Sequence, residues 1–371
     1  MTIKASPDLL LLGGRIRTLN PGRPEAQALA ISQGRIAALG QDEDIRSLAG
    51  KETRIIRLEG ASCLPGFTDA HFHMYQWAMG RARLGLDRAG SFGQCMDMLR
   101  QAGQSAQPES WILGQGFNES DWPENRMPLK QDLDQAVPSH PVLIWRCDLH
   151  LAVANSQALK LAGIKDSTPD PEGGEIGRDE HGRLSGILRE AAINRVKDSA
   201  PLPSLGTLAK AMKKAQAALH RMGVTGLGDV RLSGAGPEAA LTLRAWQRMR
   251  AGGDLAMRVF TGIPGEDLDH ALDLGLMSGL GDEYLRIGHV KYFYDGGMGA
   301  RTALMVDPYL DTGHRGMRVL DPEHLEQDMR KAHQGGLAIM VHAIGDGAVQ
   351  EVLGVYERVL RDMASGPSPA Y

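Results

Sequence analysis

Cysteine, aromatic residues and long apolar runs are all scarce in this sequence of 371 residues. The cysteines, Cys63, Cys95 and Cys147, lie far apart without a C-x-x-C pair. This spacing argues against a disulfide framework or a zinc ribbon and favours a reducing compartment. The longest early apolar run, residues 9–12, is too short for a signal-peptide core or a membrane span. These absences predict a cytoplasmic protein with no membrane partner.

A strong charge imbalance is missing as well. The net charge is −4 with 23% charged residues, so no basic field is available to attract nucleic acid or an anionic membrane. The chain is 42% apolar and long enough for about two domains with a sizeable core. Its 46 glycines exceed the average share of about 7%, as is typical of loop-rich α/β enzymes.

Residues 1–64 read as a small β unit. Short apolar runs alternate there with turn signals such as Gly-Gly, Asn-Pro-Gly and Gln-Gly. The expected strands cover residues 8–12, 15–19, 28–32, 35–39 and 54–58.

The pattern after residue 203 is a regular alternation of strands and helices, which predicts a parallel sheet with right-handed crossovers. Counted with a first strand that starts at Phe67, the later strands give strands one to five of a (β/α)8 barrel, in residues 65–74 and 204–371. The expected strands are 224–230, 257–261, 285–295 and 337–342, and the expected helices are 205–222, 237–251, 267–276, 322–334 and 348–359.

Residues 75–203 have no constant period and are expected to form an inserted subdomain. Strands are predicted at 111–117 and 142–148, a short helix at 155–163, and a hairpin at 175–186. An insertion of this size over a barrel mouth usually builds a substrate pocket or a lid.

The string Pro-Gly-Phe-x-Asp-x-His-x-His at residues 65–73 carries the first candidate site. Side chains alternate along a strand, so Asp69, His71 and His73 share one face. Neutral imidazole is the commonest metal ligand, and two positions on one rigid strand suit one small ion. For an isolated pair, two histidines with separate hydrogen bonds would be the usual interpretation.

Two later strands add candidates at the edge where barrel ligands gather. The run at residues 288–295 places His289, Lys291, Phe293 and Asp295 on one face of a strand that looks buried. A lysine is normally solvated, but burial favours the neutral amine, which can react with carbon dioxide to form a carbamate. His342 closes the fifth strand, where a ligand is favoured over a core histidine.

These strings resemble those of the amidohydrolase superfamily, specifically the imidazolonepropionase- and N-substituted formamide deformylase-like members of amidohydrolase family 3. The matching segments are residues 65–73, 290–302 and Val-His-Ala-Ile-Gly-Asp at 341–346, with the N-terminal unit resembling half of a composite β-sandwich. The resemblance implies a TIM barrel of amidohydrolase type, and a carboxylated Lys291 that bridges two metals. It implies His71, His73 and His342 as further ligands of one or two divalent ions, zinc first, with manganese or iron open. The implied reaction is hydrolysis of a C–N bond in a small molecule by metal-activated water.

The resemblance also marks residues for the substrate pocket. His150 and Glu190 stand in strings, 148–156 and 186–191, that match the subgroup carrying this insertion, although a structural role for each is equally open. Arg301 stands in the Arg-Thr position of the fourth-strand motif, where it would orient the substrate or close the loop, and Asp295 of the same motif joins the substrate-binding set.

The sequence departs from the family pattern at its C-terminal end. The family takes another metal histidine from strand six and a proton-shuttling aspartate from strand eight, and neither string occurs here. The catalytic residue is therefore not assigned. The simplest interpretation is a truncated chain of a longer enzyme; the alternatives are a fragment completed by another polypeptide and an inactive fragment with a partial metal site. Five barrel strands with open edges and an uncovered core are expected to aggregate or to recruit a partner, and a homo-oligomer is possible.

Overall fold

The structure is a computed structural model that describes residues 6–149, 151–171, 173–230, 236–298, 301–310 and 313–364. The chain divides into two compact units, Met1–Thr68 and Asp69–Tyr371. No helix in the described ranges is both long enough and apolar enough to cross a membrane.

The N-terminal unit contains two small sheets, as the alternation of apolar runs and turns predicts. One sheet has the strand order β5-β4-β1-β6 and the other β3-β2-β7. The core is formed by Leu10, Leu12, Ala28, Ala30 and Ile45. The elements are β1 (Leu9–Leu12), β2 (Arg15–Arg17), β3 (Glu25–Ala26), β4 (Ala28–Ser32), β5 (Arg35–Gly40), α1 (Asp42–Arg46), β6 (Arg54–Arg57) and β7 (Ser62–Cys63).

A five-stranded parallel sheet in the order β18-β17-β16-β15-β8 forms the centre of the second unit. This arrangement confirms the prediction of barrel strands one to five, in sequence order across the sheet. The outer edges of β8 and β18 have no strand partner within the described ranges. The strands are β8 (Phe67–Phe72), β15 (Val224–Asp229), β16 (Arg258–Pro264), β17 (Leu285–Phe293) and β18 (Ala338–His342).

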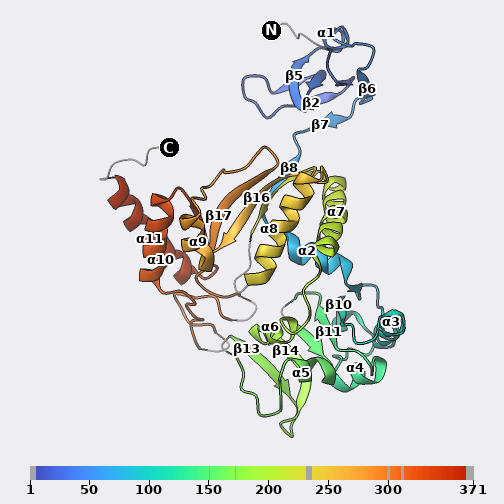
Figure 1. The fold of residues 1–371 in the computed structure, drawn as a ribbon, viewed down its shortest axis with the longest axis vertical. Helices are drawn as coiled ribbons and strands as arrows, with labels where there is room; N and C mark the ends of the chain where they lie inside the picture. Colours follow the sequence, from blue (N-terminus) through green and yellow to red (C-terminus); the bar gives the residue numbers. More distant parts are fainter. Residues whose placement is uncertain are drawn as a thin grey trace. The chain divides into compact units, whose positions relative to one another are not determined.

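Amphipathic helices cover one face of this sheet, as Figure 1 shows for α7 and α8. Trp246 of α8 is fully buried in a cluster with residues of α2, α7, β15 and β16. A second cluster joins β17 and β18 to the later helices. The elements are α2 (Met74–Ala82), α7 (Leu205–Arg221), α8 (Gly236–Ala251), η2 (Gly265–Asp267), α9 (Leu268–Asp273), α10 (Pro322–Gln334) and α11 (Asp346–Ala364).

A register shift divides β17 into two halves. Thr261 of β16 pairs with Ile287, but Ile263 pairs with Val290, so β17 contains one extra residue. Before the shift, odd-numbered Ile287 packs against the helix-side cluster; after it, even-numbered Val290 does. Lys291 therefore points to the face that the helices leave open, because a bulge exchanges the two faces of a strand.

Close backbone packing holds β8 in place. Gly228 of β15 lies so near β8 that a Cβ atom would stand 2.4 Å from the carbonyl oxygen of Ala70. No side chain fits in that space without moving a strand.

The segment that follows α2 forms a second sheet of its own, in the order β13-β14-β12-β11-β10-β9. The predicted hairpin is present as β13 and β14, and Asn155 caps α5 by accepting the Ala158 N–H at 3.0 Å. Helix α2 lies in the range assigned to the insertion, but it packs against α7 in the barrel core. The elements are β9 (Leu84–Gly85), α3 (Phe92–Ser105), β10 (Ile112–Phe117), η1 (Glu119–Asp121), α4 (Lys130–Ala136), β11 (Val142–Arg146), β12 (Leu151–Ala154), α5 (Ser156–Leu161), β13 (Gly174–Arg178), β14 (Leu184–Glu190) and α6 (Ala191–Lys197).

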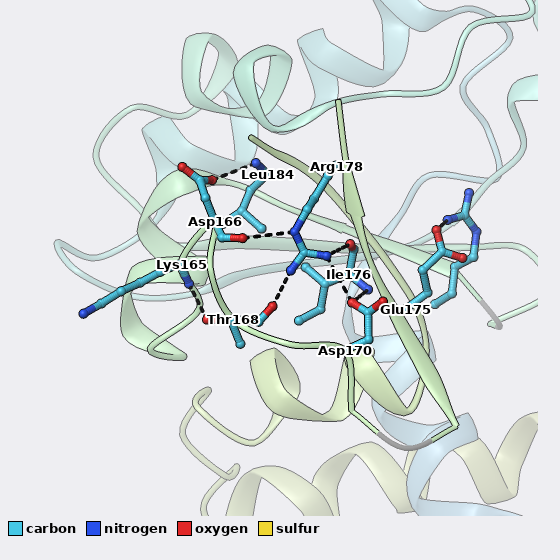
Figure 2. Close-up of polar contacts among 9 residues, drawn as sticks. Lys165, Asp166, Thr168, Asp170, Glu175, Ile176, Arg178 and Leu184 are labelled. Carbon is cyan, nitrogen blue, oxygen red and sulfur yellow. Dashed lines mark hydrogen bonds and ion pairs between the residues drawn. The ribbon is translucent and has the colours of Figure 1, made fainter. Parts of the chain in front are cut away.

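A single arginine fixes the loop between α5 and β13, as Figure 2 shows. The Arg178 guanidinium donates to the carbonyl oxygens of Asp166 (3.1 Å) and Thr168 and to the carboxylate of Asp170 (3.1 Å). The hydrogen bond from the Ile176 N–H is the main cause of the lowered pKa of the Asp170 carboxyl, and the Arg178 guanidinium lowers this pKa further. The planar fork of arginine suits such multiple contacts, so the loop is held in one conformation.

Replacing this arginine should loosen the loop. We expect Arg178→Ala to lower the free energy of unfolding by about 1–3 kcal/mol, because charged hydrogen bonds to the backbone are lost. Limited proteolysis should then cut at residues 165–170. The matched control is Arg183→Ala, which removes only an exposed ion pair with Asp179. Equal protease resistance of the two variants would show that Arg178 does not hold this loop in one conformation.

The close packing at Gly228 gives a second expectation. Gly228→Ala should destabilise the protein by about 1–3 kcal/mol, because the added methyl group pushes β8 away from β15. The control is Gly354→Ala in α11, where a Cβ atom meets only an arginine side chain at 3.6 Å. That change should stabilise the helix by about 0.5–1 kcal/mol. Urea denaturation of both variants measures the difference; wild-type stability of Gly228→Ala would refute the packing argument.

Candidate metal centre

The C-terminal ends of β8, β17 and β18 bring the predicted ligands to one edge of the sheet. His71 belongs to β8, Lys291 to β17 and His342 to β18, and His73 directly follows β8. Phe293 and His342 are register partners, and their rings lie 4.9 Å apart. Parallel strands present their carboxyl ends at the same edge, which is where barrel enzymes place their chemistry.

His73 is oriented by a backbone carbonyl. Its Nδ1 lies 2.9 Å from the carbonyl oxygen of Val230, so the ring donates there and keeps its Nε2 lone pair. The His71 ring stands beside it, with centroids 5.2 Å apart and planes at 82°. A metal-binding histidine almost always donates its second nitrogen in this way.

His71 lies in an environment that favours the neutral ring. Partial desolvation is the main cause of its lowered pKa, and the nearby groups of Lys291, His73 and His342 lower this pKa further. The Asp69 carboxylate has the opposite, smaller effect. The neutral ring is the form that binds metal ions.

Lys291 is buried, with 4% of its surface exposed. Burial lowers the pKa of its amine to about 8. The Nζ atom lies 4.9 Å from the centroid of the Phe293 ring, and desolvation is the cause of the lowered pKa. A buried lysine of this kind at a strand end is a candidate for function rather than for surface solubility.

His342 faces a backbone carbonyl through Nε2, whereas His73 does so through Nδ1. Its Nε2 lies 3.2 Å from the carbonyl oxygen of Gly296, which leaves Nδ1 as the nitrogen with a free lone pair when Nε2 carries the proton. The Asp295 carboxylate is 3.7 Å from the same Nε2.

Two buried polar residues near the centre were not among the predicted site residues. Asp229 accepts the Met74 N–H at 3.0 Å and the Trp246 indole N–H at 2.7 Å, which anchors the start of α2 beside His73. His289 lies on β17 at 8% exposure, next to the space left by Gly262. An aspartate that closes an apolar strand, as Asp229 does, was the available sequence signal.

The predicted substrate residues that the structure describes, Asp295, Arg301 and Glu190, have different surroundings. Asp295 has a fully buried side chain and accepts three backbone N–H groups, so its carboxylate holds the backbone instead of presenting a free oxygen to a substrate. Arg301 donates to the Met298 carbonyl oxygen at 3.2 Å and lies over the Tyr309 ring. Glu190 precedes α6 with φ 48° and ψ −122°, a backbone conformation that is strained for a residue with a side chain. His150 lies outside the described residues.

The donor set fits a divalent ion. In the described part of the chain, no three His, Cys, Asp or Glu side chains are close enough to hold a metal by themselves. Lys291 is the further nitrogen donor that the described strand ends offer beside the histidines. Nitrogen ligands of this kind suit zinc, and iron or manganese less specifically.

Known proteins are similar in sequence to this chain over most of its length. The protein LONG AFTER FAR-RED 3 of Arabidopsis thaliana is 34% identical over 95% of this chain, and the N-substituted formamide deformylase of Arthrobacter pascens is 27% identical over 95%. The chain spans 61% and 66% of these two proteins' lengths, so it corresponds to less than two thirds of each.

A solved structure of an uncharacterized metal-dependent hydrolase from Pyrococcus furiosus has the same fold. It superposes with a TM-score of 0.75 at 27% identity, covering 95% of this chain and 70% of the other. The sequence model of the amidohydrolase family matches residues 54–368. This chain belongs to the amidohydrolase family.

Proposed function

We propose that this chain contributes the metal-binding strands of a hydrolase that cleaves a C–N bond in a small molecule, with His71, His73, Lys291 and His342 as the ligands. The observation that carries the proposal is the buried Lys291 amine at the strand edge, close enough to His71 to affect its pKa. Family membership and the metal-dependent structural neighbour support it.

Lys291 enters this proposal as a carbamate. Its depressed pKa of about 8 leaves part of the amine neutral near physiological pH. The neutral nitrogen adds to the carbon of carbon dioxide, one C–N bond forms and one proton is released. The resulting carbamate is an anion with two oxygens, which can bridge two cations where a plain amine cannot.

The protein's own residues prepare the site for the ion. The Val230 carbonyl fixes the ring of His73, and the Gly296 carbonyl fixes the ring of His342. A bound zinc, or manganese or iron in its place, supplies the Lewis acidity and the water activation that hydrolysis requires.

The name of one relative supports a first choice of compounds to test. The relative named an N-substituted formamide deformylase makes N-formyl amines the first compounds to test, followed by cyclic amides and aminoacyl compounds. Glu190, Arg301 and His150 are proposed substrate contacts. The sheet of the inserted segment would supply the pocket around them.

A second candidate is a folded but inactive chain with a partial metal site. It is favoured by the five-stranded sheet, whose edges at β8 and β18 have no strand partner within the described ranges. Turnover of amides by the purified, folded 371-residue chain would exclude it.

Removal of the lysine should remove the metal. Lys291→Ala should abolish zinc binding and hydrolysis, because neither the amine nor its carbamate remains, and short carboxylic acids should restore part of both. Metal content after dialysis, measured by mass spectrometry, is the first readout. Lys214→Ala, which changes an exposed lysine of α7, is the control and should behave like the wild type. Full metal occupancy in Lys291→Ala would exclude the bridging role.

The two nitrogens of His73 can be tested separately. His73→Asn keeps an N–H donor near the Nδ1 position, for the Val230 carbonyl, and removes Nε2. We therefore expect the metal-free variant to melt close to the wild type, while its zinc affinity falls by at least about tenfold, as loss of a ligand or its support does.

The matched control for this variant is His140→Asn. His140 is buried and its Nδ1 lies 2.9 Å from the Ser110 carbonyl oxygen, so it makes the same hydrogen bond within the inserted sheet. Its variant should keep wild-type zinc affinity in a competition titration with a coloured chelator. Equal affinities of the two variants would show that His73 is not a ligand.

A further inference from the structure

Asp295 follows the strand that carries Lys291, and its side chain has no exposed surface. Burying a carboxylate is costly unless hydrogen bonds replace the lost water. The stability of this arrangement therefore depends on what the two carboxylate oxygens accept.

The Asp295 carboxylate accepts backbone N–H groups from two separate segments. Oδ2 accepts from Leu304 at 2.9 Å and from Gly345 at 2.8 Å, and Oδ1 accepts from Ile344 at 3.0 Å. Leu304 belongs to the loop after β17, whereas Ile344 and Gly345 form the turn after β18. Bonds from N–H groups to an ionised acceptor are roughly twice as strong as neutral ones.

The same two segments are packed together directly. A Cβ atom on Gly345 would lie 1.8 Å from the Leu304 carbonyl oxygen, so the turn and the loop are in backbone contact. Ala348 donates to that oxygen at 3.1 Å, and Val306 donates to the Asp346 carboxylate at 2.8 Å. Asp295 therefore sits at the junction of the loop and the turn.

Both segments lead to residues of the proposed site. The turn begins at Ile344, two residues after His342, and the Gly296 carbonyl that fixes the His342 ring is next to Asp295. The loop contains Arg301, the proposed substrate contact, three residues before Leu304.

We infer that Asp295 is a positioning residue, which locks the loop after β17 to the turn after β18 so that the metal ligand His342 and the Arg301 loop are placed as one unit. The inference rests on the proposed function and replaces the substrate-binding role expected for this aspartate. It predicts that the loop cannot open without disturbing the metal ligand.

The change Asp295→Asn tests this arrangement with little change in volume. Its amide has one acceptor oxygen and one NH2 group. With the oxygen in the Oδ2 position, the NH2 group faces the Ile344 N–H; in the other orientation it faces both Leu304 and Gly345. At least one donor is thus opposed by another donor, which is worse than a lost bond.

Hydrogen exchange and zinc affinity should both change in the 371-residue chain. We expect faster exchange in the peptides that contain Leu304 and residues 344–345 of metal-free Asp295→Asn. Zinc affinity, measured against a coloured chelator, should fall by about 10–100-fold, which is usual when a residue supporting a metal ligand is lost.

The matched control is Asp282→Asn, at the opposite end of β17. Asp282 also accepts backbone N–H groups, from Tyr284 at 2.8 Å and Leu285 at 3.0 Å, but it lies at the start of the strand. Its variant should melt lower without a change in zinc affinity. If Asp295→Asn merely melts lower and binds zinc as tightly as Asp282→Asn, the positioning role is refuted.

A measurement on the wild type keeps the inference testable should the variant fail to fold. The amides of Leu304, Ile344 and Gly345 should exchange as one unit, and zinc should slow all three together. Protection of the 344–345 turn without Leu304 would refute the coupling. A wild-type chain that binds no zinc would instead refute the proposed function, while exchange of the metal-free chain would still decide whether the segments open together.

Discussion

The buried amine of Lys291 is the constraint on which the end of the sheet depends. A cation at 4% exposure is unfavourable, so its surroundings must either neutralise it or supply an opposite charge. The histidines beside it carry no negative charge, and the buried carboxylate of Asp295 accepts three backbone N–H groups. Burial therefore favours the neutral amine, and the pKa of Lys291 falls to about 8.

Backbone carbonyls, and not side chains, orient the two best-defined imidazoles. Val230 takes the Nδ1–H of His73, whereas Gly296 faces the Nε2 of His342, so the rings expose different nitrogens. Both carbonyls lie just beyond strand ends, Val230 after β15 and Gly296 after β17. The orientation of the two rings therefore depends on β15, which leads to Val230, and on the pairing of β17 with β18.

Much of the fold could be predicted because its signals are local. The strands around His71, Lys291 and His342 are short apolar runs with polar ends, and the fold comparison confirms their place in a half-barrel. Helix α3 was missed since Gly93 and Gly103 interrupt its apolar pattern, although Ser91 caps it. The role of Asp295 could not be read from the sequence, because its partners at residues 304 and 344–345 are distant in the chain and offer only backbone groups. The site assignments themselves stay predictions.

The extra residue in β17 decides which side chains of the strand reach each face of the sheet. A strand with a constant period would turn Lys291 toward the helices and Val290 toward the open face. After the bulge, Val290 and Tyr292 pack in the core cluster beneath the helices, so the alternate positions Lys291 and Phe293 face the other side. The same half of the strand therefore contributes both to the core and to the candidate site. Shifting the bulge by one residue would exchange these two roles along the end of β17.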